Sequence, residues 1–253
     1  MIRKERLDIL LAERGLCASR EQAQRHVLAG EVWQGSTRLQ KPGVKLAWDS
    51  EIELRSRMPR FVSRGGEKLE HGLKAFGIGI QDRVCLDVGA STGGFTDCLL
   101  QAGAKRVFAL DVGHGQLHPK IRSHEKVSVM ERVNARHLTQ TQLVSEHSDA
   151  KDITFVCADA SFISLRLLIP AVLHSAPAAR DWLLLFKPQF EVGPEHVGKN
   201  GLVRDQTAVA QALQDFDTFM QAHHFTRTHA PTDSPVAGKK SGNTEILLHY
   251  EKN

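Results

Sequence analysis

Three polar side chains stand at the ends of apolar runs that are typical of buried strands. Asp159 follows the run TFVCA, Lys187 follows WLLLF, and Glu245 precedes ILLHY. In open α/β sheets, ligands bind at the carboxyl ends of the strands. A lysine after such a run is partly desolvated, which favours its neutral amine and suits it to proton abstraction. Nearby carboxylates favour the charged form, so the sequence leaves the resting charge of Lys187 open. A lysine at a strand end can also simply extend its amine into solvent.

A glycine loop with the pattern D-x-G-x-x-x-G-G covers residues 87–95, DVGASTGGF, after another apolar run. Glycine allows the tight turn and the close ligand approach that a side chain would block. Asp111 lies 22 residues beyond Gly89 at the end of the next apolar run, near the separation of about 20 at which an acidic side chain reaches ribose hydroxyls. The NAD spacing G-x-G-x-x-G and the P-loop are both absent. The pattern therefore predicts a nucleoside-binding unit that does not hold a pyrophosphate.

The elements around these residues alternate between apolar strands and amphipathic helices from Lys68 to the end of the chain. The strand-like runs include VCLDV, RVFALDV and ITFVCAD, and helical spacing returns between them. This alternation predicts an α/β domain with a largely parallel sheet covered by helices on both faces.

The N-terminal quarter of the chain has a different pattern. Leu7, Leu10 and Leu11 follow helical spacing before Gly15, and a second helix is expected after Ser19, which caps it together with Gln22. Short alternating segments then extend to residue 54. Two helices on a small sheet are expected here, which makes a small α+β domain.

The distribution of charge and the composition of residues 55–66 indicate where the chain divides into domains. Residues 1–64 contain 13 Lys/Arg against 8 Asp/Glu, a net charge of +5, whereas the rest of the chain is close to neutral. Residues 55–66 carry four arginines, a proline and two glycines without apolar periodicity. We therefore expect a domain at 1–54, a basic linker at 55–66 and a second domain at 67–253. The basic excess is typical of phosphate-backbone binding, although it can equally be a solvated surface.

Composition excludes several classes of protein. The four cysteines form no Cys-x-x-Cys pair and are expected to be reduced, mostly buried thiols, and no metal site is expected. No run approaches the roughly 20 apolar residues needed to span a bilayer, and no secretory signal is visible. The expectation is a cytoplasmic protein without a membrane partner and without an obligatory protein partner.

Residues 6–43 contain the segments RLD with LL, RGL, SREQA, GEV and KPG. In these segments the N-terminal quarter resembles the S-four type of RNA-binding domain. The resemblance implies that Arg6, Arg20 and Arg25 contact RNA phosphates, and Arg64 in the linker is a further candidate. Each of them can also be an ordinary solvated arginine.

The catalytic residues resemble those of the FtsJ-like ribose 2′-O-methyltransferases. Lys68, Asp159, Lys187 and Glu245 match a Lys-Asp-Lys-Glu tetrad in identity and order, and the glycine loop resembles methyltransferase motif one. The resemblance implies that Lys187 accepts or stabilises the proton of a ribose hydroxyl, that Asp159 and Lys68 set its charge and position, and that Glu245 orients the second lysine or the ribose. It also implies a Rossmann-like domain with a mostly parallel seven-stranded sheet.

Long motifs from residue 5 to residue 250 resemble the TlyA family of ribosomal RNA methyltransferases, often labelled hemolysin A. They include VSRGGEKLEHGL, ALDVGHGQLHPKIR, DASFISL and KPQFEVG. The family implies S-adenosyl-L-methionine as cofactor, ribosomal RNA or ribosomal subunits as partner, and a cytidine ribose as target. The expected cofactor-binding residues are Asp87, Gly89, Ser91, Thr92, Gly93, Gly94, Phe95, Asp111, Asn134 and Asp159, with Asn134 also readable as a turn residue. The alternatives are a membrane-active hemolysin and an RNA-binding protein that has lost catalysis.

Overall fold

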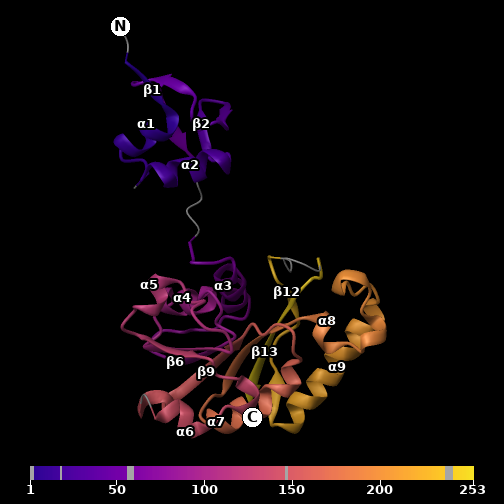
Figure 1. The fold of residues 1–253 in the computed structure, drawn as a ribbon. Helices are drawn as coiled ribbons and strands as arrows, with labels where there is room; N and C mark the ends of the chain where they lie inside the picture. Colours follow the sequence, from indigo (N-terminus) through magenta and orange to yellow (C-terminus); the bar gives the residue numbers. More distant parts are fainter. Residues whose placement is uncertain (1–2, 18, 56–59, 146–147, 237–241) are drawn as a thin grey trace. The chain divides into compact units, whose positions relative to one another are not determined.

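The structure is a computed structural model that describes residues 3–17, 19–55, 60–145, 148–236 and 242–253. The chain divides into two compact units, Met1–Arg60 and Phe61–Asn253 (Figure 1). The expected linker 55–66 therefore falls partly in each unit, and its residues 56–59 lie outside the described residues. Residues 61–66 join the large unit because the ring of Phe61 is buried in its core.

The described residues of the small unit form two helices and two small sheets. The helices are α1 (Leu7–Glu13) and α2 (Arg20–Leu28). Strand β1 (Lys4–Arg6) pairs with β4 (Lys45–Ala47), and β2 (Val32–Gln34) lies between β3 (Thr37–Leu39) and β5 (Glu53–Leu54). The expected boundaries are present: Gly15 adopts a φ of 71°, and Ser19 accepts the amide of Gln22 at 3.2 Å. The small core includes Leu7, Leu11, Ala23, Val27 and Val32.

A mostly parallel sheet forms the centre of the large unit. Its strands are β6 (Val84–Val88), β7 (Arg106–Asp111), β8 (Val127–Glu131), β9 (Ile153–Ala158), β10 (Asp181–Phe186), β11 (Phe225–Arg227) and β13 (Ile246–Lys252), and the two-residue β12 (Thr232–Asp233) pairs with β13. The order is β11-β13-β10-β9-β6-β7-β8. Neighbours from β10 to β8 are parallel, whereas β13 is antiparallel to β10 and β11. The largely parallel sheet expected from the alternation is confirmed. Among the described residues it has eight strands, one more than the seven that the FtsJ-like resemblance implies, because the short β12 joins it.

Helices cover both faces of this sheet (Figure 1). One face carries α3 (Gly65–Ala75), α4 (Gly94–Gln101) and α5 (Pro119–Arg122), and the other carries α6 (Gln140–Val144), α7 (Ile169–Ser175) and α9 (Gln206–Ala222). The short helix α8 (Pro188–Glu191) follows β10. Single 3₁₀ turns lie at Ala135–His137, Ser148–Asp152, Leu165–Leu167, Pro194–His196 and Lys199–Gly201.

The two faces explain the long apolar runs of the central strands. In β10, Trp182, Leu184 and Phe186 pack into the core on the α7 and α9 side, whereas Leu183 and Leu185 pack on the α3 and α4 side. Successive side chains of a strand point to opposite faces, so a strand buried on both sides needs an unbroken apolar run. The polar residues at the strand ends are therefore the first that can leave the core.

The cysteines and the helices of the structure bear on two of the expectations from composition. The side chains of Cys17, Cys85, Cys98 and Cys157 are buried thiols. Within the described ranges, no helix combines the length and the apolar character that a membrane crossing requires.

Candidate active site

The register of the sheet brings the strand-end residues together. Phe186 of β10 pairs with Ile246 of β13 in antiparallel register, so Lys187 and Glu245 are the next pair outward. Val88 of β6 lies beside Ala158 of β9 in parallel register, and the amide of Asp159 donates to the Val88 carbonyl at 3.0 Å. The glycine loop and Asp159 thus leave the sheet side by side.

Lys68 reaches the same place from helix α3. This helix packs closely on α4, and a Cβ atom at Gly94 would lie 2.9 Å from the backbone nitrogen of Gly66. Such a contact is too short for any side chain, so glycine at Gly94 is what allows the two helices to approach. The close packing holds Lys68 over the end of the sheet, where it is 9% exposed.

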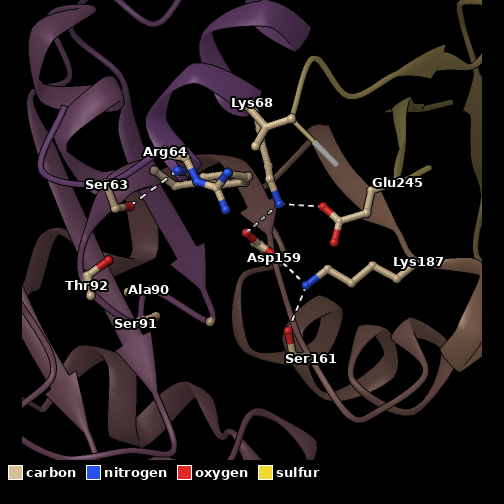
Figure 2. A pocket seen from close by; sticks show the side chains of 15 residues that line it. Ser63, Arg64, Lys68, Ala90, Ser91, Thr92, Asp159, Ser161, Lys187 and Glu245 are labelled. Atoms are coloured by element: carbon tan, nitrogen blue, oxygen red, sulfur yellow. Dashed lines mark hydrogen bonds and ion pairs between the residues drawn. The ribbon is translucent and has the colours of Figure 1, made fainter. Parts of the chain in front are cut away.

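The four tetrad side chains contact one another (Figure 2). Lys187 Nζ lies 2.5 Å from Asp159 Oδ1, and Lys68 Nζ lies 4.0 Å from Asp159 Oδ2. Lys68 also donates to Glu245 Oε2. Lys187 and Glu245 are only 5% and 4% exposed. Buried charges are tolerated when they are paired, and two lysine side chains here face two carboxyl groups.

Two adjoining cavities open at this edge of the sheet. The first, of about 300 Å³, is lined by the tetrad and by Ser63, Arg64, Gly65, Gly89, Ala90, Ser91, Thr92, Gly94, Phe95, Ser161 and Val236. The second, of about 470 Å³, lies over β6, β7 and the segment after β8. Both cavities are lined by Gly89, Ser91, Asp159 and Ser161. A ligand that fills the second cavity therefore reaches the tetrad.

The glycine loop adopts a backbone that explains its sequence. Gly89 and Gly93 have φ values of 86° and 91°, and Ser91 has a φ of 48°. A Cβ atom at Gly89 would also lie 2.8 Å from the Asp159 carbonyl oxygen. The left-handed conformation and the close approach both require glycine at this position.

Asp111 is fixed at the wall of the second cavity. Its carboxylate accepts the amide of Ser91 at 2.8 Å and the amide of Gly113 at 2.7 Å. Each carboxylate oxygen has a further lone pair, which a ribose hydroxyl can use. Asn134 lines the same cavity while its side chain accepts the amide of Arg136 at 3.0 Å, so it is both a cavity residue and a turn residue.

Two of the expected cofactor residues do not line these cavities. Asp87 and Gly93 are not among the described residues that line either cavity, whereas Thr92, Gly94 and Phe95 line the first. Asp87 is fully buried in β6 and accepts the Thr96 hydroxyl at 2.6 Å. Burial raises the pKa of Asp87 to about 7, although the Thr96 hydrogen bond opposes the shift.

The second cavity has an apolar wall that the sequence motifs did not indicate. Val112 and Phe162 are 71% and 83% exposed beside it. Val133, Ile163 and Leu168 also line it. Large exposed apolar side chains at a cavity mark a ligand surface, and a purine ring fits such a wall. The only signal in the sequence was their position just after strand ends.

In the small unit, the candidate arginines are organised by a carboxylate. Asp8 is fully buried and accepts hydrogen bonds from Arg6 Nε at 3.0 Å, Arg20 Nε at 2.9 Å and Gln24 Nε2 at 2.7 Å. Burial opposes ionisation of Asp8, but these hydrogen bonds outweigh it and hold its pKa well below the ordinary value. Arg6 and Arg20 remain 39% and 54% exposed, and Arg25 is also exposed.

No metal centre is found among the described residues, where no group of three or more His, Cys, Asp and Glu side chains is arranged to hold an ion. His114 and His118 stand four residues apart, which is a possible ligand spacing on a helix. They precede α5 instead: His114 Nδ1 lies 3.0 Å from Glu131, and His118 Nδ1 accepts the amide of Lys120.

Comparisons with known proteins identify relatives over nearly the whole chain. Residues 61–252 match the FtsJ-like methyltransferase family. The chain is 41% identical over 256 residues to the 16S/23S rRNA (cytidine-2′-O)-methyltransferase TlyA of Mycobacterium tuberculosis, covering 98% of this chain and 90% of that protein. It is 37% identical over 245 residues to Hemolysin A of Brachyspira hyodysenteriae, with 97% and 99% covered.

A solved structure gives the same result for the fold. A candidate hemolysin of Streptococcus thermophilus is 39% identical, with a TM-score of 0.72, over 100% of this chain and 90% of that one. Coverage on both sides is nearly complete, so the likeness is not limited to the glycine loop and the sheet. The chain belongs to the TlyA, or hemolysin A, family of FtsJ-like methyltransferases.

Proposed function

We propose that this protein transfers a methyl group from S-adenosyl-L-methionine to the 2′-hydroxyl of a ribose in ribosomal RNA. The observation that carries the proposal is the pairing of Lys187, Asp159, Lys68 and Glu245 at the base of a cavity that adjoins a nucleoside-sized one. The TlyA relatives are named for cytidine, which makes a cytidine ribose the favoured target.

The residues at the second cavity fit the cofactor. The apolar wall with Val112 and Phe162 suits the adenine, and Asp111 is placed to accept the ribose hydroxyls. The glycine loop leaves room for the amino-acid tail, with Ser91 and Thr92 offering hydroxyls. When bound, the cofactor supplies an electrophilic methyl group on a sulfonium.

The tetrad supplies the proton chemistry. A ribose hydroxyl is a very weak acid and must lose its proton as its oxygen bonds to the methyl carbon. Lys187 Nζ would accept this proton as the bound cofactor supplies its methyl group. Asp159 then pairs with the ammonium, while Lys68, held by Glu245, stabilises the developing negative charge on the ribose oxygen. Much of the rate gain comes from holding the reacting groups in line.

The small unit is proposed to bind RNA as an S-four type domain. Asp8 holds Arg6 and Arg20 in fixed positions, with their remaining N–H groups free to face phosphates. The exposed Arg25 and Arg64 would add phosphate contacts. Arg64 also lines the first cavity, so it can reach the phosphate next to the target ribose.

The test is to incubate the purified protein with ribosomal subunits and labelled cofactor, and to locate the label by mass spectrometry of RNA fragments. Alkaline hydrolysis needs a free 2′-hydroxyl, so a ribose-methylated nucleotide should survive as an uncut dinucleotide. Label on a base would contradict the role of the tetrad. RNA and cofactor binding without any transfer would instead favour a non-catalytic RNA-binding protein.

A further inference from the structure

Ser161 is a polar residue of the site that the tetrad does not include. It lies two residues beyond Asp159 in the loop after β9, is exposed, and lines both cavities. Its hydroxyl accepts a hydrogen bond from Lys187 Nζ at 2.8 Å (Figure 2). It is therefore in direct contact with the proposed proton acceptor.

The contacts of Lys187 Nζ restrict how this nitrogen can be oriented. Apart from its bond to carbon, the nitrogen has three tetrahedral positions. One points to Asp159 Oδ1 at 2.5 Å and one to Ser161 Oγ at 2.8 Å. A neutral amine has two N–H groups and one lone pair, so these two acceptors engage both N–H groups. The third position holds the lone pair, and since Lys187 lines the first cavity, this lone pair can face it.

The loop that carries Ser161 is tied to the segment that carries Lys187. Glu191, at the end of helix α8, accepts the Ser164 hydroxyl and the Leu165 amide, both at 2.7 Å. Helix α8 begins directly after Lys187. A single carboxylate thus fixes the distance between the amine and the serine loop, so the hydrogen bond does not depend on a freely moving loop.

We propose that Ser161 is a positioning residue that sets the rotation of the Lys187 amine, so that its lone pair faces the ribose hydroxyl. This inference rests on the proposed function and deepens it. With Asp159 alone, the amine could rotate about its C–N bond and direct either an N–H or the lone pair into the cavity. With Ser161 as second acceptor, the productive orientation is the one that satisfies both N–H groups. After the O–H bond breaks, the new N–H of the ammonium points to the cavity.

Because charged groups surround Lys187 Nζ, the proposed role of Ser161 should affect the pH dependence of the methylation rate. Asp159 contacts Lys187, while Lys68 and Glu245 contact each other beside it. A hydroxyl that accepts from an ammonium stabilises it more than it stabilises the neutral amine. Removal of the Ser161 hydroxyl should therefore make Lys187 lose its proton at lower pH, while the fraction of well-oriented amines falls.

The experiment compares Ser161→Ala and Ser161→Thr with the matched surface variant Ser145→Ala, whose hydroxyl bonds only a local carbonyl among its described contacts. In single-turnover methylation with saturating cofactor and ribosomal RNA, Ser161→Ala should be about 10-fold slower, the loss expected for one hydrogen bond to a charged group. The pH of half-maximal rate should fall by about 0.5–1 unit. Thr keeps the hydroxyl and should restore both, and saturating cofactor removes any effect of the change on cofactor binding, since Ser161 also lines the second cavity.

A wild-type rate and an unchanged pH profile for Ser161→Ala would overturn the proposal. So would a slow Ser161→Ala enzyme with an unchanged pH profile that Thr does not rescue, because that result indicates a merely structural role. A second readout needs no RNA: titration of the Lys187 side chain by NMR with 13C-labelled lysine should give a lower midpoint in Ser161→Ala. If wild-type protein methylates nothing while this midpoint still falls, the proposed function fails and the Ser161 contact stands. An unchanged midpoint refutes the contact itself.

Discussion

Lys187→Ala tests the residue on which the proposed mechanism most depends. The change removes the amine that contacts both Asp159 and Ser161 at the base of the first cavity. The nearest remaining ammonium, Lys68, is held by Glu245 and lies 4.0 Å from Asp159. The variant therefore lacks the proposed proton acceptor, while the remaining tetrad side chains stay paired with one another.

The expected loss of methylation rate follows from the role of Lys187 as proton acceptor. Removal of a general base costs about 10²–10⁴-fold in rate, which corresponds to about 3–5 kcal/mol at 1.36 kcal/mol for each factor of ten. Cofactor affinity should change little, because Lys187 lines the first cavity and is not among the residues that line the second. The prediction is therefore a large fall in the rate of transfer at nearly constant cofactor dissociation constant.

Single-turnover methylation measures the rate, and calorimetry with the cofactor is the control for folding and binding. Lys187→Arg separates two roles, since arginine keeps the positive charge but does not lose its proton in this pH range. Strong loss in both variants supports proton transfer or tight geometry, whereas near-full activity of Lys187→Arg means that charge alone suffices. A Lys187→Ala enzyme within threefold of wild type would refute the assignment of Lys187 as proton acceptor.

Three other predictions use residues outside the tetrad. Asp111→Ala removes the proposed ribose acceptor and should weaken cofactor binding by about 1–3 kcal/mol in calorimetry; equal binding would show that Asp111 does not hold the ribose. Burial raises the pKa of Asp87 from 3.8 to about 7, so the folded state keeps a proton that the unfolded state loses. The free energy of unfolding should therefore fall as pH rises from about 4 to 7, by at most about 1.4 kcal/mol per pH unit, and urea titrations should find this dependence reduced in Asp87→Asn. Arg25→Ala should weaken RNA binding and lower the slope of log affinity against log salt by about 1, with an unchanged slope excluding a phosphate contact.

Much of the fold was accessible from the sequence because its signals are local. The cap at Ser19 and the left-handed Gly15 depend on a few neighbouring residues, and both are present in the structure. The apolar runs predicted strands because a sheet covered on both faces needs continuous apolar side chains. Gly89 was predictable because its conformation and its lack of a side chain are both required where it lies.

The contacts within the site were not accessible, because they depend on strand register. Nothing local indicates that Phe186 pairs with Ile246, yet this antiparallel pair is what makes Lys187 and Glu245 neighbours. The family resemblance supplied the tetrad, whereas the sequence by itself supplied only strand ends. Asp87 illustrates the opposite case: it matched the motif, but its place inside β6 buries it against Thr96.

The same limit explains why the motifs DASFISL and RLD, which contain Ser161 and Asp8, did not indicate a role for either residue. A serine two residues after an aspartate is an ordinary turn composition, and its meaning depends on Lys187 arriving from a strand 26 residues later. Asp8 joins Arg6 and Arg20 only because α1 and α2 pack side by side in the small core. In both cases one short polar side chain fixes long cationic ones, which have the most rotational freedom to lose. A site built on lysine and arginine needs such short polar partners to hold a defined geometry. We therefore expect residues such as Ser161 and Asp8 to determine how the charged groups are oriented.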